Sequence, residues 1–223
     1  MRKCFLSVVL LSALPALATI TKIQSNATWN TNVGSCSVTL TNTVSQHLLV
    51  VWATWSPSSL TATVNDLPNT NSFPGAVGPT VQSVSNTAAQ IFYAKSIAPA
   101  SSDSIQVNFS GGTATTASCV AVEYSGADTM YPLDSVSAGY STSGNATSLL
   151  DSGTVAPANS NLLVFGGGIS DAGTATPGTN FTSIQSNGSA ITEQNTNPIT
   201  GNNTLWRGGW PPHSNCTSKS HIG

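Results

Sequence analysis

Two glutamates are the residues best suited to glycan cleavage in this chain, because glycosidases commonly work with a pair of carboxyl groups. They are Glu123 and Glu193. Glu123 ends a strand-like run beside Tyr124, where a carboxylate can project from a sheet. A glutamate in that place more often accepts hydrogen bonds from backbone amides of a neighbouring loop. The sequence therefore favours a structural role for Glu123, and a glycoside-active enzyme built around it stays a minor alternative.

Other catalytic groups do not assemble into a recognisable motif. Serines are abundant, but no Gly-x-Ser-x-Gly elbow occurs. The three histidines are His47, His213 and His221, and none lies in a context that indicates a general base. His213 and His221 lie near Cys216, but their spacing matches none of the usual zinc frameworks. The sequence therefore predicts no catalytic residue and no metal ligand.

Aspartates in turns raise the possibility of calcium. Asp128 and Asp134 flank one loop, and Asp66 closes another turn. Loop carboxylates and carbonyl oxygens hold structural calcium in many binding modules. The ordinary preference of Asp for turns accounts for the same three residues without a metal. We therefore expect no cofactor, with structural calcium as the open alternative.

Aromatic side chains are the remaining candidates, because sugar faces stack on flat apolar surfaces with polar neighbours. Trp52 and Trp55 point to opposite faces of a strand, so at least one belongs to the core. Trp55 precedes Ser56 and Pro57 at the start of a loop, so it is the one expected near the surface. The predicted ligand-binding residues are Trp55, Tyr131, Asp128 and Asp134.

The first 18 residues predict export. Arg2 and Lys3 precede a mostly apolar stretch that ends in a small-x-small pattern at Ala16–Ala18. This is the layout of a secretory signal peptide cleaved after Ala18, and the apolar stretch is shorter than the ~20 residues that span a bilayer. We expect a secreted, extracellular protein that starts at Thr19 and does not insert into membranes.

Charge restricts the partners. Removing Arg2 and Lys3 from the six cations leaves four against eight acids, and only 6% of residues are charged. A chain with no basic stripe is a poor partner for nucleic acid or for an anionic membrane. The hydrophobic share of 39% argues against disorder. The polar surface must instead consist of Ser, Thr, Asn and Gln, and with the aromatic candidates above we expect a polysaccharide or a cell-surface glycan as the partner.

Three cysteines follow the leader, namely Cys36, Cys119 and Cys216. Cys36 and Cys119 each lie in a strand-like stretch, so they are the preferred disulfide in an oxidising compartment. The alternative is that both are small buried hydrophobic residues. Cys216 would then be a free or intermolecular thiol.

The strands are organised around residues 47–55, a long run of β-branched and aromatic residues that predicts a strand buried on both faces. Residues 161–165 are a fainter echo of it. Residues 35–41 and 104–110 alternate cleanly between apolar and polar side chains. Residues 67–80 are dense in Pro and Gly, which predicts a long surface loop. Further strands are expected at 23–29, 60–64, 89–95, 116–124, 135–140, 146–150, 161–169 and 180–186.

Short strands at this spacing, without any helical periodicity, indicate one all-β domain: an antiparallel sandwich, jelly-roll-like, over residues 19–205. An immunoglobulin domain fits less well, because no Trp is suitably placed between two close cysteines. Two tandem small domains meeting near residue 130 were the other possibility, but no linker separates the halves. Residues 206–223 contain two prolines and no alternation, so an irregular, altered or truncated tail is expected.

The texture of "LLVVWATW", "IFYAKSI", "CVAVEYSGAD" and "NSNLLVFGGG" resembles uncharacterised secreted bacterial modules with lectin-like or jelly-roll sandwiches. The resemblance covers roughly residues 30–170 and carries no catalytic residues. It implies a non-catalytic module for glycan binding or surface adhesion, presented on loops 65–80 and 125–135. The alternative is a structural component of a matrix or envelope that self-associates.

Overall fold

The computed structural model describes residues 19–83, 85–141, 154–155, 162–170, 175–178, 180–187, 190–195, 203–204 and 215–222. In these ranges every regular element is a β-strand, and every strand pair is antiparallel. The predicted all-β antiparallel sandwich is confirmed. The expected signal peptide and the expected strand at 146–150 lie outside the described residues.

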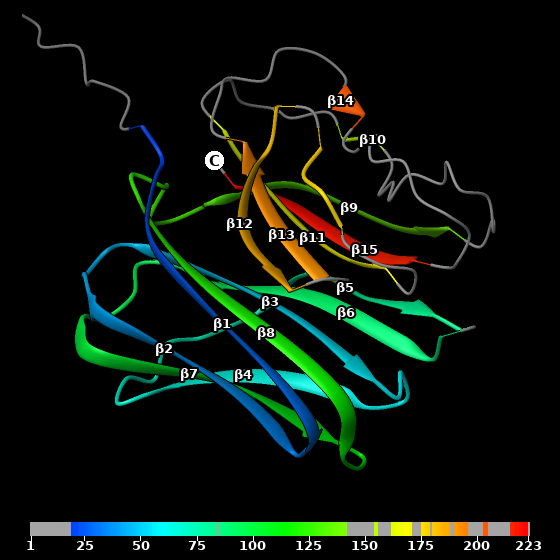
Figure 1. The fold of residues 1–223 in the computed structure, drawn as a ribbon. Helices are drawn as coiled ribbons and strands as arrows, with labels where there is room; N and C mark the ends of the chain where they lie inside the picture. Colours follow the sequence, from blue (N-terminus) through cyan, green and yellow to red (C-terminus); the bar gives the residue numbers. More distant parts are fainter. Residues whose placement is uncertain are drawn as a thin grey trace, which may run out of the picture.

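Three sheets form three layers (Figure 1). Sheet A has the order β1 (Thr21–Val33), β8 (Ala114–Ser125), β3 (Leu48–Ser56), β6 (Thr87–Ala94) and β5 (Gly75–Gln82). Sheet B has the order β2 (Ser35–Thr43), β7 (Ala100–Ser110) and β4 (Thr61–Leu67). Sheet C has the order β12 (Thr182–Asn187), β13 (Ala190–Asn195), β11 (Leu163–Ser170), β15 (Asn215–Ile222) and β9 (Leu133–Ser141). A small ladder joins β10 (Thr154–Val155) to β14 (Asn203–Thr204).

Sheet A is the middle layer, and strand β3 is its centre. β3 pairs with β8 on one side and with β6 on the other. Its first eight residues are all buried, as the continuous apolar run predicts. Alternate side chains of β3 enter two separate cores. One core fills the space between sheets A and B, and the other fills the space between sheets A and C.

The core between sheets A and B follows the alternation in the sequence. Cys36, Val38 and Leu40 of β2 face Leu49 and Val51 of β3, and all are at most 3% exposed. Apolar side chains on every second residue of a strand produce this one-sided burial.

The predicted Cys36–Cys119 disulfide is present and joins sheet B to sheet A across this core. The two Cα atoms are 6.2 Å apart, within the range that a disulfide spans. Both cysteines are at most 1% exposed. The bridge therefore fastens the two layers from inside their shared core.

The region 67–80 is not one long loop, which corrects the expectation from its prolines. Leu67 still belongs to β4, and β5 starts at Gly75. β5 is the edge strand of sheet A, and its register with β6 shifts twice between Gly75 and Thr80. An edge strand with bulges tolerates proline, because an N–H that faces away from the sheet is not needed for pairing. Only the middle of the region is a loop.

The tail is also not irregular throughout. Residues 215–222 form β15, which pairs with β11 on one side and with β9 on the other. The sequence of β15 is polar and shows no alternation of apolar residues, so a local sequence pattern does not predict this strand. The strand is defined by its pairing with a neighbour on each side. The other residues of the tail lie outside the described ranges.

Candidate functional site

Trp55 is a core residue and not a surface platform. Its side chain is 1% exposed and packs between sheets A and B, with its ring centroid 5.8 Å from that of Phe109. The indole Nε1 donates a hydrogen bond to the carbonyl of Leu60 at 3.1 Å. The expectation of a surface position for Trp55 is therefore wrong, because β3 is covered up to its last residues.

Tyr131 and Asp128 lie together in the exposed loop between β8 and β9. Asp128 accepts hydrogen bonds from the backbone amides of Met130 and Tyr131, at 2.7 and 2.9 Å. These bonds, with a smaller contribution from Lys95, lower the pKa of Asp128. Tyr131 is 76% exposed, and the Lys95 ammonium lies 5.7 Å from its ring centroid. Asp128 thus stabilises the turn of its own loop, as expected for an aspartate in a turn. The aromatic ring of Tyr131 remains exposed.

Asp134 follows this loop, in strand β9, and is half-buried. Among the described residues, no group of three or more His, Cys, Asp or Glu side chains is arranged to hold a metal ion. The four predicted ligand residues therefore occupy three different places in the fold.

Glu123 is completely buried and held on several sides. Its carboxylate accepts hydrogen bonds from the amide of Gln24 at 2.6 Å and from the backbone N–H of Val44 at 2.9 Å. The Nδ1 atom of His47 lies 2.7 Å from Oε1. Gln24 and Val44 bind both carboxylate oxygens, so Glu123 acts as a structural anchor between strands. The interpretation that a neighbouring loop amide binds this glutamate fits the geometry.

Two further acids are buried between sheets A and B near Glu123. Burial raises the pKa of Asp103 to about 6, and the negative charge of Asp66 adds to the rise. A hydrogen bond from Thr43 acts in the opposite direction, and Glu123 raises the pKa of Asp103 further. Asp66 itself accepts the backbone N–H of Asn71 at 3.0 Å. These acids face the protein interior and not an open surface.

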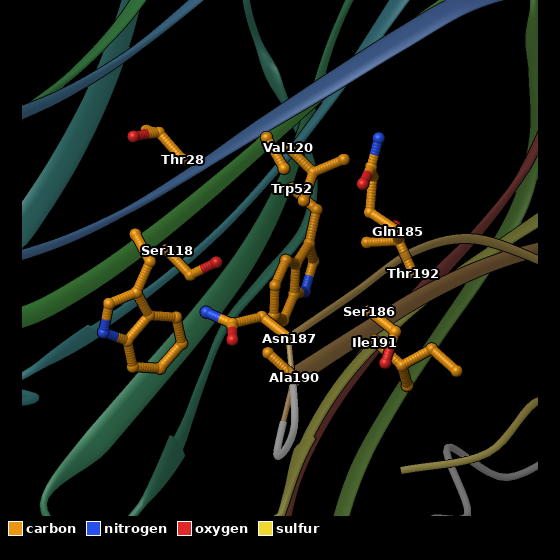
Figure 2. A pocket seen from close by; sticks show the side chains of 12 residues that line it. Thr28, Trp52, Ser118, Val120, Gln185, Ser186, Asn187, Ala190, Ile191 and Thr192 are labelled. Carbon is orange, nitrogen blue, oxygen red and sulfur yellow. The ribbon is translucent and has the colours of Figure 1, made fainter. Parts of the chain in front are cut away.

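The best-formed cleft lies between sheets A and C, on the opposite side of sheet A from these acids. It encloses about 210 Å³. Its walls come from β1, β3 and β8 of sheet A and from the β12–β13 hairpin of sheet C (Figure 2). We call it the A–C cleft, and its lining residues are Ala27, Thr28, Trp29, Trp52, Ser118, Val120, Gln185, Ser186, Asn187, Ala190, Ile191 and Thr192.

Two tryptophans give the A–C cleft an aromatic character. Trp52 is fully buried and enters the cleft from β3, while Trp29 on edge strand β1 is 37% exposed. The β1–β8 register places Trp29 opposite Ser118. One ring therefore lies at the bottom of the cleft and the other at its rim.

Glycine in sheet C makes room for the Trp52 ring. A Cβ atom on Gly167 would lie 2.2 Å from Cδ1 and 2.3 Å from Nε1 of Trp52. No side chain fits at that distance, so Gly167 in β11 lets the indole lie against the backbone. The run Gly166–Gly168 thus serves packing inside a strand and does not break it.

The polar atoms beside Trp52 are unusual in lacking partners. The Nε1 atom of Trp52 and the Oγ1 atom of Thr192 are both buried, and neither has a hydrogen-bond partner among the described residues. Gly167 pairs with Thr192, and Thr192 pairs with Gln185 in the next strand. Figure 2 shows the Trp52 nitrogen on the side of the ring toward Thr192 and Gln185. Buried polar groups usually have partners, so this pair calls for an explanation.

Of the described residues that line the A–C cleft, none carries a charged side chain. Its hydrogen-bonding groups are the amides of Gln185 and Asn187 and the hydroxyls of Ser and Thr residues. Nothing in the sequence indicates that Trp29 and Trp52 meet. The lining residues come from four distant parts of the chain, so only the fold brings them together.

Comparisons with known proteins give no relative. No family model matches the chain, and no curated protein or solved structure is detectably similar to it. In the described part of the chain, no helix has the length and apolar character needed to cross a membrane.

Proposed function

We propose that this protein is a secreted, non-catalytic module that binds a glycan in the A–C cleft. One observation carries the proposal. An uncharged cleft combines two tryptophans with amide and hydroxyl side chains, and two of its buried polar atoms lack partners. Sugars offer apolar ring faces for aromatic stacking and hydroxyls for neutral hydrogen-bonding groups.

The scaffold around the cleft is suited to binding without rearrangement. Trp52 and Val120 stand on β3 and β8, the two most buried strands of sheet A. Side chains on packed strands hold the geometry of a binding site more precisely than side chains on loops do. The proposed binding site therefore lies on strands and not on loops 65–80 and 125–135.

Acid–base chemistry has no support at this cleft. Within the described part of the chain, the lining includes no Asp, Glu, His or Cys residue. Both glutamates are fully buried: Glu123 is bound by Gln24 and Val44, and Glu193 accepts the backbone N–H of Gly178 at 2.8 Å. Binding without turnover is therefore the function that this geometry favours.

Affinity electrophoresis through gels that contain a panel of neutral polysaccharides tests the proposal. We expect one glycan to retard the wild-type protein and the Trp29→Ala variant to lose this retardation. Tyr131→Ala is the matched control, because Tyr131 is the more exposed ring and lies outside the cleft. Retardation lost in Tyr131→Ala and kept in Trp29→Ala would move the site to the β8–β9 loop. No retardation by any glycan would remove the proposal.

A self-associating structural component is the second candidate, and edge strand β1 is the observation that favours it. Ile23 is 47% exposed and Trp29 is 37% exposed on this strand, and exposed apolar edge strands promote association. Sedimentation velocity over a range of concentrations distinguishes the two. Assembly that needs no glycan and is abolished by Ile23→Lys supports the structural role, whereas a monomer at all concentrations opposes it.

Export is part of the proposal and has its own test. A protein expressed with its complete N-terminus should appear outside the cell with Thr19 as its first residue. N-terminal sequencing of the secreted protein measures this directly. Retention of residues 1–18 would contradict a cleaved leader.

A further inference from the structure

The unpartnered atoms at the bottom of the A–C cleft restrict what the cleft can bind. Trp52 Nε1 can only donate a hydrogen bond, whereas the Thr192 hydroxyl can donate and accept. Both atoms are buried, and leaving such groups unpaired costs free energy that a ligand oxygen can recover. One ligand hydroxyl serves both: its oxygen accepts from Nε1, and its hydrogen is donated to Oγ1.

We propose that the A–C cleft holds the terminal residue of a neutral glycan, one hexopyranose ring, with a hydroxyl between Trp52 and Thr192. This inference rests on the proposed function and names the ligand class for the same site. The ligand is an uncharged sugar and not a uronic acid or a sulfated sugar, because none of the described residues that line the cleft is a cation that could pair with an anion.

The size of the cleft supports a single ring. Its volume of about 210 Å³ is below the roughly 300–1,000 Å³ of pockets that enclose drug-sized ligands. A longer stretch of polysaccharide would need further contacts along a groove. Trp29 at the rim stacks on the ring, and the amides of Gln185 and Asn187 are placed to bind its outer hydroxyls.

Thr192→Val removes the buried hydroxyl with almost no change of shape. Removing an unpaired buried hydroxyl should leave the fold as stable as before or more stable. Loss of one ligand hydrogen bond should weaken sugar binding about tenfold. Thr54→Val is the matched control, since Thr54 is another buried threonine, in β3 of sheet A, but it donates to the carbonyl of Ala88 and is not among the residues that line the cleft.

The decisive experiment follows the five indole N–H signals of ¹⁵N-tryptophan-labelled protein during sugar titrations. The probes are glucose, galactose, mannose and N-acetylglucosamine, with glucuronic acid as the anionic counterpart. A Trp52→Phe variant assigns the Trp52 signal. We expect one neutral monosaccharide to shift the Trp52 signal at millimolar concentration and glucuronic acid to leave it unchanged. Short oligosaccharides of the same sugar should bind within about threefold of the monosaccharide.

Three results would overturn the inference and leave the proposed function intact, provided that a polysaccharide still retards the wild-type protein and not Trp29→Ala. One is a stationary Trp52 signal during binding. Another is affinity that rises more than about tenfold with oligosaccharide length, which indicates an extended groove. The third is equal binding of glucuronic acid. If no polysaccharide retards the protein at all, the inference and the proposed function fail together.

Discussion

The two faces of sheet A are both buried, yet they are closed in different ways. Toward sheet B, a disulfide crosses the core and the indole N–H of Trp55 is bonded to the carbonyl of Leu60. Toward sheet C, the equally buried Trp52 has an indole N–H without a partner and lies beside a cleft. The same strand thus supplies a satisfied tryptophan to one core and an unsatisfied one to the other. The B side thus has a covalent link and a paired indole, whereas on the C side the buried indole N–H beside the cleft has no partner among the described residues.

Breaking the disulfide should have the largest effect, and only on the B side. Replacing Cys36 and Cys119 together by alanine opens a loop with a sequence separation of 83. The chain-entropy model gives a loss of about 4 kcal/mol in the free energy of unfolding. Urea denaturation measures this loss, and glycan retardation of the folded protein should persist because the cleft lies on the other face. A change below about 1 kcal/mol would contradict the role of the bridge as the main fastening of this core.

Gly167→Ala is the corresponding disruption on the C side. The added Cβ would meet the rigid indole of Trp52 at 2.2 Å, so strand β11 or the ring must move. Overpacking of this kind costs roughly 1–3 kcal/mol, and we expect a value near the upper end. Thermal and urea unfolding measure the cost. Gly34→Ala is the control because a Cβ there meets nothing within 4 Å, and equal losses in both variants would refute the close approach at Gly167.

The contrast between the faces also explains what the sequence predicts and what it does not. The continuous apolar run in β3 and the alternation in β2 reflect burial directly, so both strands and the Cys36–Cys119 pair follow from the sequence. Period-two alternation shows that Trp52 and Trp55 face opposite ways. It does not show which layer covers each face, and for that reason Trp55 is wrongly expected at the surface.

Strands that are defined by pairing with their neighbours cannot be predicted from a local sequence pattern. β15 is polar, and its identity as a strand comes from pairing on both sides with β11 and β9. β5 carries prolines that are compatible with a strand only because it lies at the edge of sheet A. The A–C cleft combines residues 27–29, 52, 118, 120, 185–187 and 190–192, and no pattern within any one of these segments predicts the site.

Asp103 gives the stability of the B side a pH dependence. Its pKa is raised from 3.8 to about 6 in the folded protein, so the folded state binds a proton more tightly than the unfolded state. The resulting stabilisation is complete below pH 3.8 and is lost as the pH rises to about 6. At 1.36 kcal/mol per pKa unit the loss is about 3 kcal/mol. Urea unfolding from pH 4 to 7 should show this slope, and Asp103→Asn should flatten it. An unchanged slope in the variant would assign the dependence to other groups.

The smallest predicted difference compares the two tryptophans directly. Trp55→Phe and Trp52→Phe remove the same atoms from the same buried strand, so their cavity costs should be similar. Trp55→Phe also leaves the Leu60 carbonyl without its donor, whereas Trp52→Phe removes an N–H that has no protein partner. The Trp55 variant should therefore be less stable by about 1 kcal/mol in urea unfolding. In glycan binding the order should reverse, with Trp52→Phe the weaker binder and Trp55→Phe like the wild type. If the two variants were equal in both measurements, the unpaired indole of Trp52 would have no role in either stability or recognition, and the functional distinction between the two faces would fail.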